Sequence, residues 1–137
     1  MKQPVILLCV LLLFANFKPV NKKTSNSIGI NFGKGGGITG LYEKYTLSKN
    51  GVLWKYSDYD STKELIKTIP KTKHNYIIKK ISNKALQSIN LNEAGNMNSY
   101  IELTKGLKVF KRFQWPIEKM DIPVQIKELD SLLNTLL

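Results

Sequence analysis

Short runs of alternating hydrophobic and polar residues occupy the first half of the chain, at 28–32 (IGINF), 41–47 (LYEKYTL) and 52–56 (VLWKY). Alternation with a period of two is typical of half-buried strands. In the second run the side predicted to face inward carries Leu41, Tyr45 and Leu47, with Glu43 as a polar interruption. The pair Asn50-Gly51, between the second and third runs, favours a type I′ hairpin turn. Together the runs predict a three-stranded antiparallel meander.

The pattern changes around Pro70. Residues 63–69 (KELIKTI) predict a fourth, irregular strand that ends before the proline, because the residue preceding a proline is disfavoured in the helical region. From Lys71 onward apolar residues recur at steps of three and four, which predicts a helix ending near Asn83 or Asn90. Its apolar side would hold Tyr76, Ile77, Ile81, Leu86 and Ile89, and its solvent side Lys73, Lys79, Lys80 and Lys84.

A second hairpin and a final helix complete the chain. Residues 100–103 and 109–115 predict two strands that turn at Lys105-Gly106, and aromatic residues on both faces leave the inward face open. Asp121 is predicted to be the N-cap of the last helix, and Pro123 suits its first turn. The stripe expected to pack on the sheet consists of Ile122, Ile126, Leu129, Leu133 and Leu136.

The whole pattern predicts the α+β class, with the order β-β-β-(β)-α-β-β-α. An antiparallel sheet of about five strands would carry the C-terminal amphipathic helix packed on one face. The 137 residues are enough for one domain with one modest core, which we place at 26–137.

Residues 1–25 have the composition of an export signal or N-terminal anchor followed by a polar tether. Lys2 precedes an apolar run from Pro4 to Phe17, which is shorter than the roughly 20 residues that span a bilayer. Cleavage after Ala15 is one outcome; retention as an inner-membrane tether is the other, since Leu13 stands where a small residue is usual. Cys9, the single cysteine, lies inside this run, so a cleaved chain would have neither disulfide nor thiol chemistry. The pattern predicts export to the periplasm or the cell surface.

The positive charge comes almost entirely from lysine. The chain has 21 basic residues, of which Arg112 is the only arginine, against 10 acidic ones. Without Lys2, Lys18, Lys22 and Lys23, 17 basic residues face 10 acidic ones, a formal net charge of +7. Because arginine is the usual residue for bidentate contacts to phosphates and bases, this composition argues against specific nucleic-acid recognition. An anionic surface or an envelope protein is the expected kind of partner.

Glycines are concentrated at 33–40 (GKGGGITG), and Gly35–Gly40 formally satisfies GxGxxG. A dinucleotide fingerprint requires a helix after the last glycine, and a Walker loop requires a lysine there, whereas here a strand is predicted and Lys34 precedes the glycines. We therefore interpret the segment as a hairpin or bulge that needs positive φ, or a flat backbone strip against which something packs. The candidate partner-contact residues are Lys34, Gly35, Gly36, Gly37, Tyr59 and Trp115.

Recognisable catalytic and metal-binding patterns are missing from the sequence. His74, the only histidine, has no second histidine, cysteine or nearby acid, so we expect a surface helix residue. Asp58 and Asp60 lack the glycine and the closing acid of a calcium loop. No cofactor is expected. The favoured hypothesis is an exported, non-enzymatic domain of the cell envelope with a binding or structural role. The alternatives are a protease inhibitor that inserts the edge of the glycine-rich hairpin at 33–40 into a cleft, and a small hydrolase without a recognisable motif.

Four motifs carry a resemblance over about residues 28–136: FGKGGGITG, YTLSKNGVLW, AGNMNSYIEL and RFQW. With Gly35–Gly40 as a GGG[FI]TG turn, this combination resembles a group of small, uncharacterised exported α+β proteins of Bacteroidetes-type bacteria. The resemblance implies export and one α+β domain, and it implies no activity. The glycine-bearing strand is also similar to that of emfourin-type inhibitors of metalloproteases, which is the origin of the inhibitor alternative.

Overall fold

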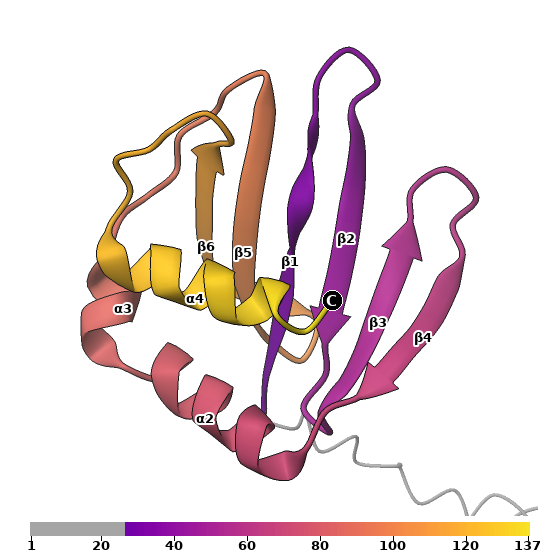
Figure 1. The fold of residues 1–137 in the computed structure, drawn as a ribbon, viewed down its shortest axis with the longest axis vertical. Helices are drawn as coiled ribbons and strands as arrows, with labels where there is room; N and C mark the ends of the chain where they lie inside the picture. Colours follow the sequence, from indigo (N-terminus) through magenta and orange to yellow (C-terminus); the bar gives the residue numbers. More distant parts are fainter. Residues whose placement is uncertain (1–26) are drawn as a thin grey trace, which may run out of the picture.

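A computed structural model describes residues 27–137 as a single sheet with helices on one side. Within these residues, six strands and three helices follow one another, as Figure 1 traces them. Their bounds are β1 Ile28–Gly36, β2 Leu41–Leu47, β3 Val52–Ser57, β4 Lys63–Thr68, α2 Lys71–Ile81, α3 Lys84–Ser88, β5 Met97–Lys105, β6 Lys108–Pro116 and α4 Val124–Asn134.

The sheet is antiparallel throughout, with the strand order β4-β3-β2-β1-β5-β6. The α+β prediction is therefore confirmed, with six strands in place of about five. The irregular run at 63–69 does join the sheet, because β4 pairs with β3 on both sides of a bulge at Leu53/Trp54. The first strand of the chain, β1, lies in the middle of the sheet, between β2 and β5.

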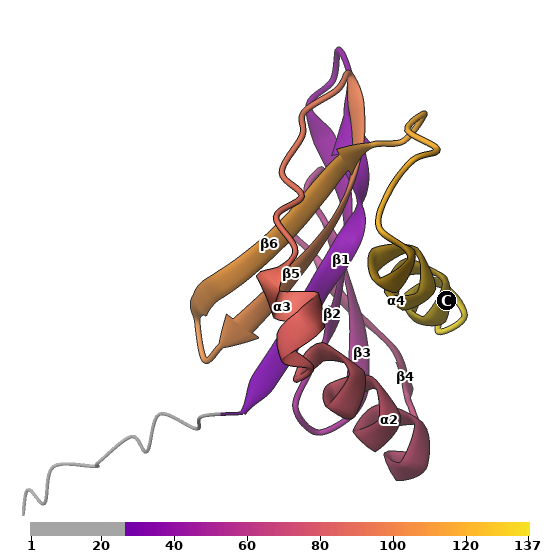
Figure 2. The same ribbon diagram turned by 90° about the vertical axis from the view of Figure 1, so that its left-hand side faces the viewer.

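Helices α2 and α4 cover the same face of the sheet and leave the opposite face without a helical layer (Figures 1 and 2). Between sheet and helices lies one hydrophobic core, to which β1, β2, β5 and β6 contribute alternate residues. The predicted stripe of the last helix is confirmed: Ile126, Leu129 and Leu133 are fully buried. The helix starts later than predicted, because Pro123 rather than Asp121 is its N-cap, and the Pro123 carbonyl accepts hydrogen bonds from the first-turn amides.

The predicted central helix is two helices. The chain leaves helical geometry after Ser82, and the side chain of Asn83 caps α3 by accepting a hydrogen bond from the Ala85 amide at 2.9 Å. Ile77 and Ile81 are buried as predicted, whereas Tyr76 is 58% exposed. The predicted stripe was therefore wrong at Tyr76, which lies beyond the edge of the contact with the sheet.

The two hairpins differ in how closely they follow the predictions. The turn between β2 and β3 contains four residues, 48–51, and only Gly51 among them has positive φ, so the type I′ prediction was wrong. The second hairpin forms as predicted, and its inward face is settled by the helices. Ile101, Leu103, Phe113 and Trp115 face the core. Leu41, predicted to face inward, is 46% exposed, because it pairs with Gly36 at the end of the sheet that α4 does not reach.

The two edges of the sheet differ in whether another segment of the chain covers them. Residues 91–93 run beside β6 and exchange backbone hydrogen bonds with Gln114, which covers that edge. The opposite edge strand, β4, is open along its outer side and carries Lys63, Glu64 and Lys67, charges of the kind that discourage pairing with another chain.

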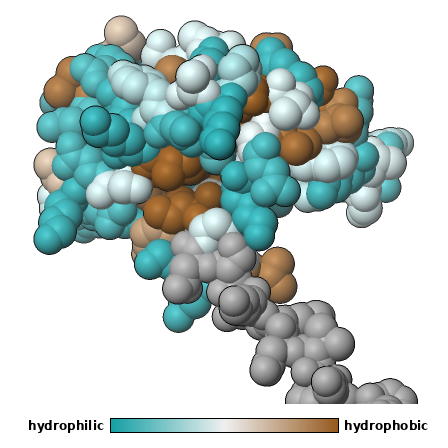
Figure 3. All heavy atoms as spheres, turned by 90° about the horizontal axis from the view of Figure 1, so that it is seen from below, coloured by the Kyte–Doolittle hydropathy of each residue, from teal (hydrophilic) through white to brown (hydrophobic). Residues whose placement is uncertain are grey.

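The predicted export signal or anchor, the candidate cleavage site after Ala15 and Cys9 lie at 1–26, outside the described residues. Within 27–137, no helix is both long enough and apolar enough to span a membrane. Seen from the end at which β1 begins, patches of hydrophobic side chains lie within a largely hydrophilic surface (Figure 3).

Candidate functional site

The glycine-rich segment is not an edge of the sheet. Residues Gly33–Gly36 belong to β1, which pairs with β2 on one side and with β5 on the other. An edge can be extended by a partner strand only if its amides and carbonyls are free. The edge-insertion form of the inhibitor hypothesis was therefore wrong about this segment, and only the four residues at 37–40 project beyond the sheet.

The glycines at the tip meet a backbone requirement, as predicted. Gly36, Gly37 and Gly40 have φ of 113°, 70° and 63°, values that other residues rarely adopt. The Gly37 amide donates to the Asn96 carbonyl at 2.6 Å, which ties the tip to the start of β5. Because the tip leads into β2 and not into a helix, it lacks the helix N-terminus that a dinucleotide fingerprint provides. Ile38, between these glycines, is fully exposed.

The other candidate contact residues lie in different parts of the structure and differ in their exposure to solvent. Tyr59 is 89% exposed at the β3–β4 turn. Trp115 is only 4% exposed and belongs to the core, so its side chain is not available to a partner. Lys34 lies on the helix-covered side of β1, near the end of α4. The structure does not bring the six candidate residues together.

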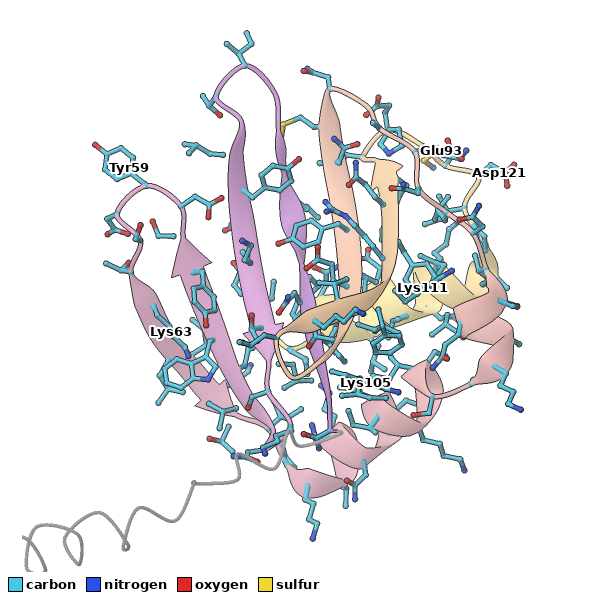
Figure 4. All side chains as sticks on the ribbon, turned by 180° about the vertical axis from the view of Figure 1, so that it is seen from behind. Tyr59, Lys63, Glu93, Lys105, Lys111 and Asp121 are labelled. Atoms are coloured by element: carbon cyan, nitrogen blue, oxygen red, sulfur yellow. The ribbon has the colours of Figure 1, made fainter. Side chains whose placement is uncertain are left out.

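A different set of aromatic side chains lies together on the helix-free side of the sheet, which faces the viewer in Figure 4. We call this the aromatic face and define it by Tyr42, Trp54, Tyr56 and Tyr100. They come from three strands, and the strand register puts them on one face, because residues directly opposite each other in a sheet point to the same side. Tyr56 is opposite Lys44, and Lys44 and Tyr100 are both opposite Gly33. Tyr42, Trp54 and Tyr56 are half-buried, whereas Tyr100 is 3% exposed.

Two glycines of β1 form the floor of the aromatic face. A Cβ on Gly35 would lie 2.6 Å from the Tyr42 ring, and one on Gly33 would lie 3.2 Å from the Tyr100 hydroxyl. The two tyrosine rings meet edge to face, with their centroids 5.8 Å apart. The prediction of a flat backbone strip against which something packs is thus confirmed, and what packs there is a pair of tyrosines.

Cations flank the aromatic face on both sides. Lys63 Nζ lies 4.0 Å from the centroid of the Trp54 ring and 5.4 Å from that of Tyr56 (Figure 4). The Arg112 guanidinium lies 5.6 Å from the Tyr100 centroid. Burial, and then the nearby Glu102 and Asp58 carboxylates, raise the pKa of Tyr100 far above its usual range, so it stays a neutral phenol.

A hydrogen-bonded row continues the aromatic face across four strands. Thr46 Oγ1 donates to Asn31 Oδ1 at 2.9 Å, and Asn31 Nδ2 donates to Glu102 Oε2 at 3.1 Å. Glu102, whose side chain is 16% exposed, also pairs with Arg112 at 3.4 Å. The row therefore pairs the half-buried Glu102 carboxylate with Arg112 and places amide and hydroxyl groups beside the rings.

A second polar cluster lies under the C-terminal end of α4, around a cavity of about 70 Å³. It brings Lys34 and Glu43 from neighbouring strands together with Asp130 of α4. Tyr45 donates a hydrogen bond to Glu43 at 3.0 Å, and Lys55 pairs with the same oxygen at 3.3 Å. Such a cavity holds about two water molecules, given roughly 30 Å³ for each. Hydrolysis of a larger substrate here would require the cavity to open.

The surroundings of this cluster raise the pKa values of Tyr45 and Asp130. Burial raises the pKa of Tyr45, and its hydrogen bond to Glu43 adds to the effect. Burial also raises the pKa of Asp130, against the opposing influence of Lys34 and of the Asn134 amide. The effect of burial on the pKa of Asp130 is therefore larger than the combined opposite effect of Lys34 and Asn134.

Asp130→Asn is expected to stabilise the protein at neutral pH. A carboxyl group with a raised pKa binds more protons in the folded than in the unfolded state, so stability falls as pH rises from the unfolded toward the folded pKa. The amide does not ionise and escapes this loss. Urea unfolding of both proteins should therefore give similar midpoints at a pH below the ordinary carboxyl pKa, about 3.9, and a higher midpoint for the variant at pH 7. A lower midpoint at pH 7 would show instead that the Lys34–Asp130 attraction dominates.

Three further sequence candidates have structural roles. His74 was predicted to lie on the surface, but it is half-buried beside Gly51 of the β2–β3 turn, with a buried Nε2. Asp58 accepts a hydrogen bond from the Tyr42 amide, and Asp60 caps its own turn through Thr62. Across residues 27–137, no three His, Cys, Asp or Glu side chains are grouped so that they could hold a metal ion.

A surface groove of about 600 Å³ separates α2 from α4. Tyr76 and Val124 give it apolar surface, and the Lys80–Glu128 ion pair crosses it at 2.6 Å. Because that pair already joins the two helices, the groove is better explained as a helix–helix seam than as a ligand site.

A scan against protein-family models finds no match for this chain, and a search of curated proteins finds no relative. The resemblance to exported α+β proteins and to emfourin-type inhibitors therefore stays a prediction.

Proposed function

We propose that this protein is an exported, non-enzymatic binding domain of the cell envelope, and that it binds an envelope saccharide on the aromatic face. The observation that carries the proposal is the row of half-buried rings on the side of the sheet without a helical layer. Export is inferred from the apolar run at 4–17. Cell fractionation tests it, and recovery of the full chain in the cytosol would contradict it.

The chemistry of the aromatic face suits a ligand with both flat apolar faces and hydroxyl groups. Aromatic rings supply large contact area at a low cost in conformational entropy. Trp54 and Tyr56 are held in place by Lys63, and the Thr46–Asn31–Glu102 row lies beside them with hydrogen-bonding groups. Sugar rings combine these two properties, which favours a saccharide over a purely apolar molecule.

Tyr56→Ala is expected to weaken saccharide binding at least about tenfold, the loss typical of an aromatic contact residue. Tyr76→Ala is the matched control, because Tyr76 is 58% exposed and belongs to α2, on the helix-covered side of the sheet. Titration of the full chain with soluble peptidoglycan fragments, followed by tryptophan fluorescence, gives the affinities. Trp54 reports on the aromatic face, whereas Trp115 is buried and should respond little.

Equal losses in the two variants, or no binding by the parent chain, would contradict the saccharide proposal. The inhibitor alternative requires a different surface, because an inhibitor would act through the exposed tip at 37–40. Inhibition of a secreted metalloprotease by the full chain, undiminished in Tyr56→Ala, would favour that alternative.

A further inference from the structure

Charge is unevenly distributed between the two ends of the sheet. We call the basal end the one at which β1 begins and at which the β2–β3 and β5–β6 turns lie; Ile28 is paired with Lys105 there. The β3–β4 turn, the loop that leads into β5 and the loop that follows β6 lie at the other, apical end (Figure 1). Apical loops carry five of the ten acidic residues: Asp58, Asp60, Glu93, Glu118 and Asp121.

Among residues 27–137, the charged side chains at the turns of the basal end are lysines. Lys49 lies in the β2–β3 turn, and Lys105 and Lys108 flank the β5–β6 turn. Lys71 and Lys73 belong to the first turn of α2, which a hydrogen bond from the Ile69 amide to the Gly51 carbonyl holds beside the β2–β3 turn. None of the four ion pairs in the described part of the chain involves these lysines. Their charge is therefore not neutralised by the protein's own carboxylates.

Apolar side chains project from the same end. Leu107 is fully exposed at the tip of the β5–β6 hairpin, and Val109 and Phe110 are 41% and 38% exposed just behind it. Lys105 Nζ lies 5.2 Å from the centre of the Phe110 ring, so apolar and cationic groups interleave (Figure 4). An apolar tip surrounded by lysines is the composition of a segment that inserts at an anionic membrane surface.

The course of the chain supports the same partner. Residues 1–26 precede β1, so the apolar run at 4–17 is joined to the basal end of the sheet through the residues at 18–26. If the run is retained in a membrane, the nine residues at 18–26 can extend at most about 30 Å. The basal end would then be confined near the lipid, which raises the effective concentration of the hairpin at the surface.

We propose that the basal end docks on an anionic lipid surface, with Leu107 of the β5–β6 hairpin inserted among the head groups and Lys49, Lys105 and Lys108 contacting the phosphates. The acidic apical loops are repelled by the same surface, which orients the domain with its tip at 37–40 away from the membrane. The proposal concerns a surface other than the aromatic face and does not depend on saccharide binding.

The test follows an environment-sensitive probe at two equally exposed positions of the full chain. With Cys9→Ser as background, Leu107→Cys places the probe at the basal end and Ile38→Cys places it at the apical tip. On vesicles of neutral lipid with about a quarter anionic lipid, the probe at 107 should shift to the blue and be quenched by nitroxide-labelled lipid. The probe at 38 should do neither. Both proteins share the residues at 1–26, so vesicle attachment through that segment is the same in the two, and the charge reversals below separate docking from the proximity that attachment gives.

Charge reversal separates docking from simple proximity. Lys105→Glu with Lys108→Glu should weaken docking of the probe at 107 by about thirtyfold or more, from the usual contribution of two lysines near an anionic surface. Lys84→Glu with Lys127→Glu changes the net charge equally at two exposed lysines of α3 and α4, and should leave the signal intact. Loss of the signal on purely neutral vesicles is also expected.

Three results would overturn the proposal. One is equal quenching at positions 38 and 107, and another is a signal at 107 that is the same on neutral and anionic vesicles. The third is a probe at 107 that responds to a DNA duplex in lipid-free buffer but not to vesicles, which would assign the basal end to a polyanion.

Discussion

Gly33→Ala is expected to lower the free energy of unfolding by about 3 kcal/mol, the upper part of the range for inserting a group into a packed interior. A Cβ at this position would lie 1.8 Å from the Glu43 carbonyl oxygen and 2.9 Å from its carbonyl carbon. These are backbone atoms of β2, so no rotamer change can relieve the overlap. Because β1 pairs on both sides, the strands must separate at the centre of the sheet.

Gly106→Ala is the control for this prediction. Gly106 has φ of 60°, but a Cβ there would meet no atom within 4 Å. Only the backbone cost remains, about 1 kcal/mol. Urea unfolding monitored by circular dichroism compares the two variants with the parent chain. Equal losses would indicate that backbone conformation, and not the close approach of β1 and β2, explains the glycine at 33.

Leu129→Ala is expected to cost about 3 kcal/mol or more, the usual loss when a buried leucine is truncated and a cavity remains. Leu129 is fully buried in the middle of α4, between Ile126 and Leu133 of the same stripe. The helix is attached to the sheet by this stripe, so its loss should also expose the polar cluster around Asp130. The midpoint of urea unfolding measures the effect.

Val124→Ala serves as the matched substitution on the same helix, because Val124 is 61% exposed. Removal of an exposed apolar group changes stability by no more than about 0.5 kcal/mol. If Leu129→Ala unfolds at nearly the urea concentration of Val124→Ala, then α4 contributes little to the core, and the two-layer description of the fold fails.

Local patterns were sufficient to predict most of the secondary structure. The period of two in 28–32, 41–47 and 52–56 depends only on residues close in sequence, and so does the stripe from Ile126 to Leu136. Strand and helix periods result from backbone geometry within one element. Boundaries were less accurate where one side chain had competing roles: Asn83 ended one helix and capped the next, and Pro123 replaced Asp121 as a cap.

The candidate site could not be found in the same way. Tyr42, Trp54, Tyr56 and Tyr100 come from three strands, and each alone is an ordinary strand residue. A signal was present in the sequence, since the hairpin at 100–115 has aromatic residues on both faces. Which face is covered depends on where α2 and α4 pack, and that contact lies outside any local window.

The glycine-rich strand β1 shows most clearly which properties local sequence determines and which depend on tertiary structure. Its glycines favoured positive φ at the tip, and the predicted strand after them argued against a phosphate loop, because both properties depend on neighbouring residues. Its place at the centre of the sheet came from pairing with β5, about 70 residues later in the chain, for which no short-range pattern exists. That long-range pairing turned a predicted edge into the floor beneath two tyrosines. It also brought the lysines of the β5–β6 turn beside the residue at which the chain enters the sheet.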